Sequence, residues 1–285
     1  MADDRKRAGG YGEGGVAPAM SAADVAREAE ALGESVPRDA LLALCGAAPI
    51  LELRDLRAGY GAMEILHGID LAVASGQSLC LVGPNGAGKS TVLHSIFGFT
   101  KIMSGAVVAG GRDVTRHTSS AKLKDAGIAY ILQDNSIFAD MTVEENLLMG
   151  GYLLADRARA HEAAERVFAR YDRLSKRRRE RAGVLSGGER RLLEISRALI
   201  MDPQVLLVDE PSIGLEPRMI DMVFEILADL GEGQGKTIVM VEQNARRGLE
   251  FADLGYVMVS GRVALAGKGA ELLENPEVGR LFLGG

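Results

Sequence analysis

One nine-residue stretch restricts the possible fold of this chain more than any other feature. It fits the pattern G-x-x-x-x-G-K-[ST], follows the apolar run 79–82 and precedes a helical pattern, which is the strand-to-helix setting of a phosphate-binding loop. Glycines allow the tight turn that points backbone N–H groups at phosphates, and the dipole of the following helix adds positive potential. We expect Lys89 to neutralise the β and γ phosphates of a nucleotide and Ser90 to contact Mg²⁺. The loop consists of Gly83, Pro84, Asn85, Gly86, Ala87, Gly88, Lys89, Ser90 and Thr91.

A pair of carboxylates follows a second apolar run. Residues 205–208 are apolar and end in Asp209 and Glu210, with Pro211 directly after. Pro211 disfavours a helix interior at this point, and open α/β sheets bind ligands at the carboxyl edge of their strands. We therefore expect Asp209 to hold Mg²⁺, through water, and Glu210 to be the general base that polarises an attacking water molecule.

The order of the apolar runs predicts an α/β domain. From residue 50 onward, short β-type runs alternate with amphipathic helical segments, which is typical of a largely parallel sheet. Thr142 and Glu145 form a T-x-x-E capping box, which predicts a helix start. Strands are expected near 51–53, 78–82, 127–132, 205–209, 237–241 and 256–260. Helices are expected to begin after Gly88, at Thr142, after Gly187 and near Met219.

Two segments differ from this alternation. Residues from about 134 to 185 are expected to form a helical subdomain inserted into the domain, with their run of basic residues as solvated surface. Residues 1–49 are expected to be an N-terminal extension, whose Gly-rich, charged opening predicts disorder. Short helices are predicted in this extension by the capping box of Ser21 and Asp24 and by Pro37.

Composition argues against several classes of function. The net charge of −6 and the pI of about 5.4 provide no overall field that attracts nucleic acid, so no nucleic-acid partner is expected. Cys45 and Cys80 lack the spacing of a metal site, and Cys80, inside an apolar run, is expected in the core. The chain has no apolar run of about 18 residues and no N-terminal signal pattern, so a cytoplasmic protein is expected.

Residues 185–189, with the sequence LSGGE, resemble the signature motif of ABC ATPases. The resemblance covers about residues 50–285, and the motifs follow the order of that family. It implies a P-loop NTPase of the ABC ATPase type, with a largely parallel core sheet, an antiparallel β part and a helical subdomain. In that family two cassettes enclose two ATP molecules, and the signature contacts the ATP of the partner subunit. The matching positions are Ser186, Gly187, Gly188 and Glu189.

Four other positions are interpreted through the same resemblance. Tyr60 matches the aromatic residue that stacks on adenine, and Gln133 matches the loop glutamine that touches Mg²⁺ and links the nucleotide to the membrane partner. Gln243 stands where most ABC ATPases have the switch histidine that contacts the γ-phosphate. An amide can donate a hydrogen bond there but cannot hold a positive charge. Glu216 stands where the family usually has Asp, in the loop after the catalytic glutamate.

With these departures, the chain is similar to the second ATP-binding subunit of branched-chain amino acid importers. The runs that match are 142–147, 242–244 and 281–285, although that subgroup commonly has Pro-Glu where this chain has Leu132 and Gln133. The resemblance implies an ATP-hydrolysing motor on the inner face of the cell membrane. Its partners would be permease subunits, a second ABC ATPase in a hetero- or homodimer, and indirectly an extracytoplasmic solute-binding protein. A urea or short-chain amide importer, an export motor and a soluble ABC ATPase outside transport are the alternatives.

Overall fold

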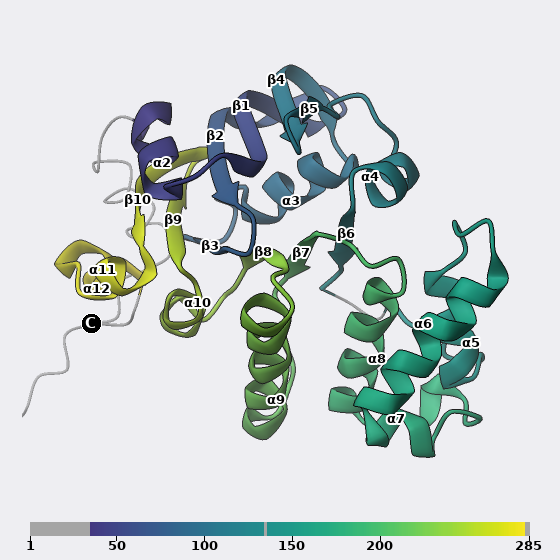
Figure 1. Cartoon of the computed structure of the whole chain (residues 1–285). Helices are drawn as coiled ribbons and strands as arrows, with labels where there is room; N and C mark the ends of the chain where they lie inside the picture. The colour runs from purple at the N-terminus through teal and green to yellow at the C-terminus, as the bar shows by residue number, and fades with distance from the viewer. Residues whose placement is uncertain (1–34, 134–135, 283–285) are drawn as a thin grey trace, which may run out of the picture.

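The computed structural model describes residues 35–133 and 136–282, which form two sheets with helices between and around them (Figure 1). The larger sheet has the strand order β10-β9-β3-β8-β7-β6. Its strands from β9 to β6 are parallel to their neighbours, whereas β10 is antiparallel to β9. They are β3 (Ser78–Val82), β6 (Ile128–Ile131), β7 (Val205–Asp209), β8 (Thr237–Val241), β9 (Leu254–Val259) and β10 (Arg262–Lys268).

The smaller sheet is antiparallel, with the strand order β2-β1-β4-β5. Helix α3 (Lys89–Phe97) lies between the two sheets, as Figure 1 shows. Its Val92 and Leu93 are buried in one apolar cluster with Leu53 of the smaller sheet and Leu81 of the larger sheet. One helix thus joins both sheets into a common core. The strands of the smaller sheet are β1 (Pro49–Tyr60), β2 (Met63–Ala74), β4 (Lys101–Ala109) and β5 (Arg112–Asp113).

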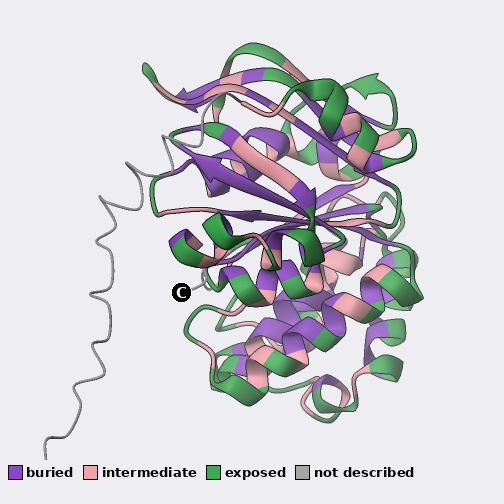
Figure 2. Ribbon diagram, turned by 90° about the vertical axis from the view of Figure 1, so that its left-hand side faces the viewer, coloured by how far each residue is buried: buried purple, intermediate pink, exposed green. Residues whose placement is uncertain are grey.

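The central strands are buried on both faces, as the purple segments in Figure 2 show. Along β7, Val205 and Leu207 belong to the cluster around α3, whereas Leu206 and Val208 belong to the cluster under the outer helices. Successive side chains of a strand point to opposite faces. A strand covered on both faces is therefore continuously apolar, which explains why the run 205–208 shows no alternation.

Most of the remaining helices cover the outer face and the ends of the larger sheet, whereas the first described helix packs against β2 of the smaller sheet. Within the described residues, the segment between β6 and α8 contains helices α5 to α7 and a 3₁₀ turn at Ala182–Val184. No described helix is long and apolar enough to cross a membrane. The helices are α2 (Arg38–Cys45), α4 (Ser119–Asp125), α5 (Val143–Gly150), α6 (Arg157–Arg170), α7 (Asp172–Lys176), α8 (Gly187–Leu199), α9 (Pro217–Ala228), which continues as a π turn at Asp229–Gly233, α10 (Ala245–Phe251), α11 (Gly269–Leu273) and α12 (Pro276–Phe282).

The predicted strands miss β2, β4, β5 and β10 and cover only the start of β1. Glycine weakens the sequence signal of a strand, and β2 and β4 contain Gly68 and Gly105. Gly105 has φ 83°, and a Cβ on it would lie 2.3 Å from the carbonyl oxygen of Asp55, next to a register shift between β1 and β4. A glycine that weakens the sequence pattern is therefore what allows these strands to approach each other.

The predicted helix starts agree well with the structure. The Thr142 side chain accepts from Glu145 N, and the Glu145 carboxylate accepts from Thr142 N, so the capping box is confirmed. Helix α9 begins at Pro217, two residues before the expected start at Met219. Helix α2 begins directly after Pro37, whereas the box of Ser21 and Asp24 and the Gly-rich opening lie outside the described residues.

The basic run 176–181 is more than solvated surface. Arg177 donates to Glu180 and Glu189, and Arg178 donates to Glu144 and Glu165. These ion pairs connect the segment before α8 with the first turns of α5 and α8. The expectation from charge alone was too simple because it did not include acidic partners from other helices.

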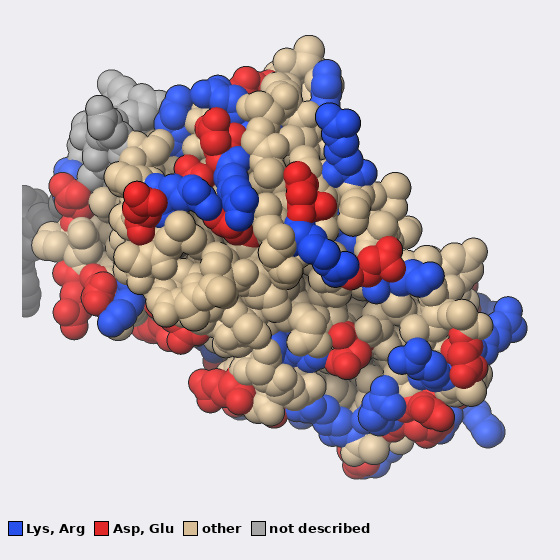
Figure 3. All heavy atoms as spheres, turned by 45° about the horizontal axis from the view of Figure 1, so that its top comes forward, with Lys and Arg blue, Asp and Glu red and all other residues tan. Residues whose placement is uncertain are grey.

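Charged side chains are interspersed over the antiparallel sheet, on the face that Figure 3 turns toward the viewer. Arg57 pairs with Glu64 at 2.8 Å, and Arg54 pairs with Glu52 at 2.6 Å. Glu52 also accepts from Arg38 of α2. The N-terminal helix is thus tied to this sheet by charge as well as by the buried Leu41.

Candidate nucleotide site

Four of the predicted site segments meet at one edge of the larger sheet. β3, β8, β7 and β6 are consecutive neighbours, and each is followed by a predicted functional residue at its carboxyl end. The backbone N–H of Glu210 donates to Val241 O at 2.9 Å, which joins the ends of β7 and β8. The strand order therefore brings together the loop 83–91, Gln133 and Gln243 around the pair Asp209 and Glu210.

The loop 83–91 has the backbone shape of a phosphate cradle. Gly83, Gly86 and Gly88 have φ values of 147°, 84° and 95°, which other residues rarely adopt. A Cβ on Gly83 would lie 2.2 Å from Met258 O, whereas one on Gly86 would have no atom within 4 Å, so the turn is tight on one side and open on the other. Such a turn before a helix N-terminus binds anions.

Lys89 lies across this loop. Its Nζ donates to Gly83 O at 2.8 Å and to Pro84 O at 3.0 Å, and the residue is buried. Burial lowers the pKa of Lys89, and the nearby carboxylates of Glu210 and Asp209 oppose that change. The cation is thus held inside the loop by carbonyl groups, which phosphate oxygens could replace.

The predicted metal ligands Ser90 and Asp209 are already in contact. Ser90 Oγ donates to Asp209 Oδ1 at 3.0 Å, and Asp209 is buried. A hydroxyl and a carboxylate are the oxygen ligands that Mg²⁺ prefers. Within residues 35–133 and 136–282, no group of three His, Cys, Asp or Glu side chains could hold a metal ion. The site therefore fits an ion that receives its other ligands from phosphates and water, as Mg²⁺ commonly does.

Sequence reasoning missed Tyr130, which contacts the other oxygen of Asp209. Its OH group donates to Asp209 Oδ2 at 2.8 Å, and burial, together with the charge of Asp209, raises the pKa of Tyr130. A neutral phenol therefore holds the carboxylate in place. The only available signal was an aromatic residue near the end of β6, three positions before Gln133.

Glu210 has an unusual backbone conformation. Its φ of 42° lies in the left-handed region, which costs energy for a residue with a side chain and is found often at functional sites. Gln133 Nε2 donates to Glu210 Oε2 at 2.9 Å. The structure thus joins the predicted general base to the loop glutamine.

Tyr60 ends β1 and is 45% exposed. Its OH group is hydrogen-bonded to Nδ1 of His94 in α3, and the His94 ring in turn makes edge contacts with Phe99 and Tyr130. Burial lowers the pKa of His94, which favours the neutral ring. Through His94 the exposed aromatic is held beside the helix that follows the loop 83–91, and its stacking on adenine stays a prediction.

The LSGGE residues begin α8. Ser186 Oγ accepts from Glu189 N at 3.3 Å, and Glu189 Oε2 accepts from Ser186 N at 2.9 Å, which caps the helix. A Cβ on Gly188 would lie 2.1 Å from Met219 Sδ, so a larger residue there would have to displace the Met219 side chain at the contact of α8 with α9. Gly187 lines a cavity of 310 Å³ together with Gln133 and Glu210.

Gln243 is exposed in the loop between β8 and α10. The neighbouring Glu242 is buried, and its Oε1 accepts from Ser212 Oγ at 2.7 Å and from Asn244 N at 3.0 Å. Glu242 therefore joins the loop that contains Gln243 to the loop after Glu210. Sequence reasoning assigned no role to this carboxylate.

A phosphate cradle, a paired hydroxyl and carboxylate, and a second carboxylate directly after the first at the end of β7 define a P-loop nucleotide-hydrolysing domain. Comparison with known proteins makes this class more specific. The family model described as ABC transporter matches residues 66–213. The chain belongs to this family and is the ATP-binding ATPase subunit of an ABC transporter, as the resemblance in its sequence predicted.

Several relatives are similar over nearly their whole length. The branched-chain amino acid transport ATP-binding protein BraG of Pseudomonas aeruginosa is 40% identical over 226 residues, which cover 79% of this chain and 96% of that protein. The probable branched-chain amino acid transport ATP-binding protein LivF of Archaeoglobus fulgidus is 38% identical over 229 residues, which cover 80% of this chain and 96% of that protein. The lipopolysaccharide export protein LptB of Haemophilus influenzae is 30% identical over 240 residues, 82% of this chain and 97% of that protein.

Solved structures have the same fold. A nucleotide-free ATP-binding cassette from an ABC transporter matches with a TM-score of 0.73 and 28% identity, over 83% of this chain and 100% of that chain. The expected fold, with its parallel core sheet, antiparallel β part and helical portion, is confirmed.

Proposed function

We propose that this subunit drives the import of branched-chain amino acids. The observation that supports it most is the 40% identity to BraG over 96% of that protein's length, with LivF at 38%. The export protein LptB is only 30% identical over a similar coverage. In this proposal the subunit lies on the inner face of the cell membrane and works in a pair of cassettes with separate permease subunits and an extracytoplasmic solute-binding protein.

The described contacts support a hydrolytic mechanism in which the chain's own residues bind and orient the nucleotide. Lys89 exchanges its bonds to two loop carbonyls for bonds to the β and γ phosphates. Ser90, Asp209 and Gln133 would hold Mg²⁺, which supplies charge neutralisation at the phosphates. Glu210 orients the attacking water and accepts its proton. Tyr60 stacks on the adenine ring.

Two further groups contact a γ-phosphate in this mechanism, and the first of them acts across the pair of cassettes. The start of α8 offers backbone N–H groups at a capped helix N-terminus, which suits the γ-phosphate of the partner's ATP. Gln243 would contact the γ-phosphate in its own cassette through its amide N–H. We assign residues 50–285 to the ATPase domain and about 134–185 to its helical subdomain.

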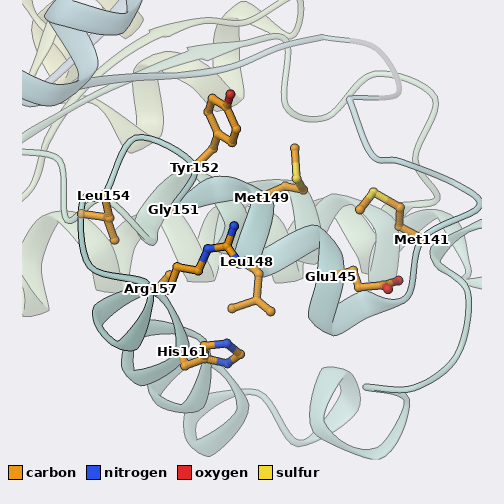
Figure 4. Close-up of a pocket in the computed structure, with 10 residues that line it drawn as sticks. Met141, Glu145, Leu148, Met149, Gly151, Tyr152, Leu154, Arg157 and His161 are labelled. Carbon is orange, nitrogen blue, oxygen red and sulfur yellow. The ribbon is translucent and has the colours of Figure 1, made fainter.

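The same helical part offers a groove for a permease. A cavity of 330 Å³ lies beside α5 and α6, and Figure 4 displays the side chains around it. Its lining combines apolar Leu148, Met149 and Leu154 with His161, and Tyr152 at its edge is 79% exposed. Glu145 and Arg157 add charged groups to this lining, so the groove is amphipathic. We assign it to a short amphipathic segment of the permease.

Purification of the tagged chain from its native membrane tests this proposal. Recovery of a second cassette, two permease chains and a binding protein is expected, and the binding protein should be stabilised against heat by leucine, isoleucine or valine. If only urea or short-chain amides stabilised the binding protein, the chain would instead belong to an importer of those solutes. Recovery of the chain alone or with ribosomal or DNA-repair proteins would refute the import proposal and leave the ATPase assignment intact.

A further inference from the structure

Three charged side chains lie along one line of α8, three residues apart, on a helix that is otherwise packed through apolar side chains. They are Arg191, Glu194 and Arg197. Arg191 Nη1 donates to Glu194 Oε2 at 2.9 Å, and the two residues are only 5% and 7% exposed. A buried ion pair is weak evidence for a stabilising role because desolvation offsets the attraction. The reason for this pair is better sought in its other contacts.

Those contacts reach both sides of Gln133. Arg191 Nη1 donates to Leu132 O at 2.7 Å, directly before Gln133. On the other side, the N–H of Ser136 donates to Glu194 Oε1 at 3.0 Å. A single buried pair on α8 therefore binds the backbone before and after the loop glutamine.

Two more contacts extend this connection. Arg197 donates to Ser136 O, and its guanidinium lies 5.4 Å from the ring centre of Phe138. Arg191 Nη2 also approaches Asp209 O at 3.4 Å, next to the general base. Bonds to backbone atoms set the path of the loop directly, and their charged donors make them strong and directional.

We propose that Arg191 and Glu194 are positioning residues that fix the backbone on both sides of Gln133 to the signature helix. Through these contacts the pair holds the Gln133 amide against Glu210. This inference rests on the roles proposed above for Gln133 and Glu210. If the pair were purely stabilising, its removal would lower the melting temperature and leave these loop properties unchanged in the folded protein.

The first test follows the loop itself. The chain contains no Trp, so Phe138→Trp provides a single fluorophore beside Arg197. In that background Glu194→Gln should increase acrylamide quenching about twofold, because Gln keeps only one of the two oxygens that accept from Arg191 and Ser136, and the loop loses a restraint. The matched control is Arg159→Gln on the exposed side of α6, which should leave quenching unchanged. Equal quenching in the Glu194→Gln and parent proteins would overturn the proposal.

The second test asks whether the pair acts through Gln133. Glu194→Gln should lower kcat for ATP hydrolysis about tenfold and change KM by less than about twofold, because the phosphate loop is untouched. Adding Glu194→Gln to Gln133→Ala should slow the reaction no further. Multiplicative losses in the double variant, or a loss confined to KM, would refute an action through Gln133.

A conservative variant covers the case in which Glu194→Gln does not fold. Arg191→Lys keeps the charge, but one ammonium cannot replace the two guanidinium nitrogens, of which Nη1 reaches Leu132 O and Glu194 and Nη2 approaches Asp209 O, so an intermediate loss of kcat is expected. Wild-type kcat in Arg191→Lys would contradict the proposal. The quenching measurement needs no ATP hydrolysis. If the chain were inactive but Glu194→Gln still increased acrylamide quenching of the Trp, the proposed catalytic roles would be refuted. The connection of the loop to the helix would stand.

Discussion

Lys122 provides a test of how a buried charge beneath the phosphate-loop helix affects stability. The residue has no exposed surface, and its Nζ donates one hydrogen bond, at 3.4 Å, to Ser95 O in α3. Burial lowers the pKa of Lys122 from its usual 10.5 to about 8, against the smaller opposing effect of Asp113. The charged ammonium is therefore disfavoured in the folded chain.

The pKa values give the size and the pH range of the effect. Below pH 8 the lysine is charged in both states and the whole penalty acts, which amounts to about 3 kcal/mol at about 1.4 kcal/mol per pH unit. Between pH 8 and 10.5 the unfolded chain binds the extra proton, so stability rises with pH through this window. At pH 9.5 the remaining penalty is about 1 kcal/mol, and above pH 10.5 it vanishes.

Lys122→Met removes this penalty with a side chain of similar shape. It also loses the bond to Ser95, worth about 1 kcal/mol, so the variant should be more stable by about 2 kcal/mol at pH 7 and nearly equal to wild type at pH 9.5. Urea unfolding at both pH values measures the difference, with Lys124→Met, an exposed neighbour on α4, as the control. A variant that is less stable at pH 7, or a difference that does not change with pH, would refute the reasoning.

Three other predictions concern the site. Glu210→Gln should trap an ATP-bound dimer visible by size-exclusion chromatography, and Gln243→Ala should slow steady-state ATPase less than Glu210→Gln; equal losses would contradict this order. Tyr130→Phe removes the bond that orients Asp209 and should raise the Mg²⁺ concentration for half-maximal ATPase about tenfold, with an unchanged Mg²⁺ titration as the opposing result. Gly188→Ala should displace the Met219 side chain at the contact of α8 with α9 and cost about 1 kcal/mol in urea unfolding; an unchanged midpoint would contradict this expectation.

Local features were predictable because their atoms lie close together in the sequence. The strand, loop and helix around residues 83–91 follow one another along the chain, and so do the two halves of the capping box at Thr142 and Glu145. Asp209 and Glu210 end a buried strand, and the apolar run before them already indicates the sheet edge. These patterns depend on hydrogen bonds and side-chain periods that span only a few residues.

The sequence alone therefore determined the class of the protein, the phosphate loop and the pair of carboxylates. Only the tertiary structure decided which side chains support them, because such contacts depend on the order of strands in the sheet. Tyr130 reaches Asp209 across 79 positions, and Ser136 reaches Glu194 across 58. The periodicity of a single helix or strand contains no information on contacts between residues so far apart in the sequence. The residues that hold the site in place thus became visible only when β6, β7 and α8 were brought side by side.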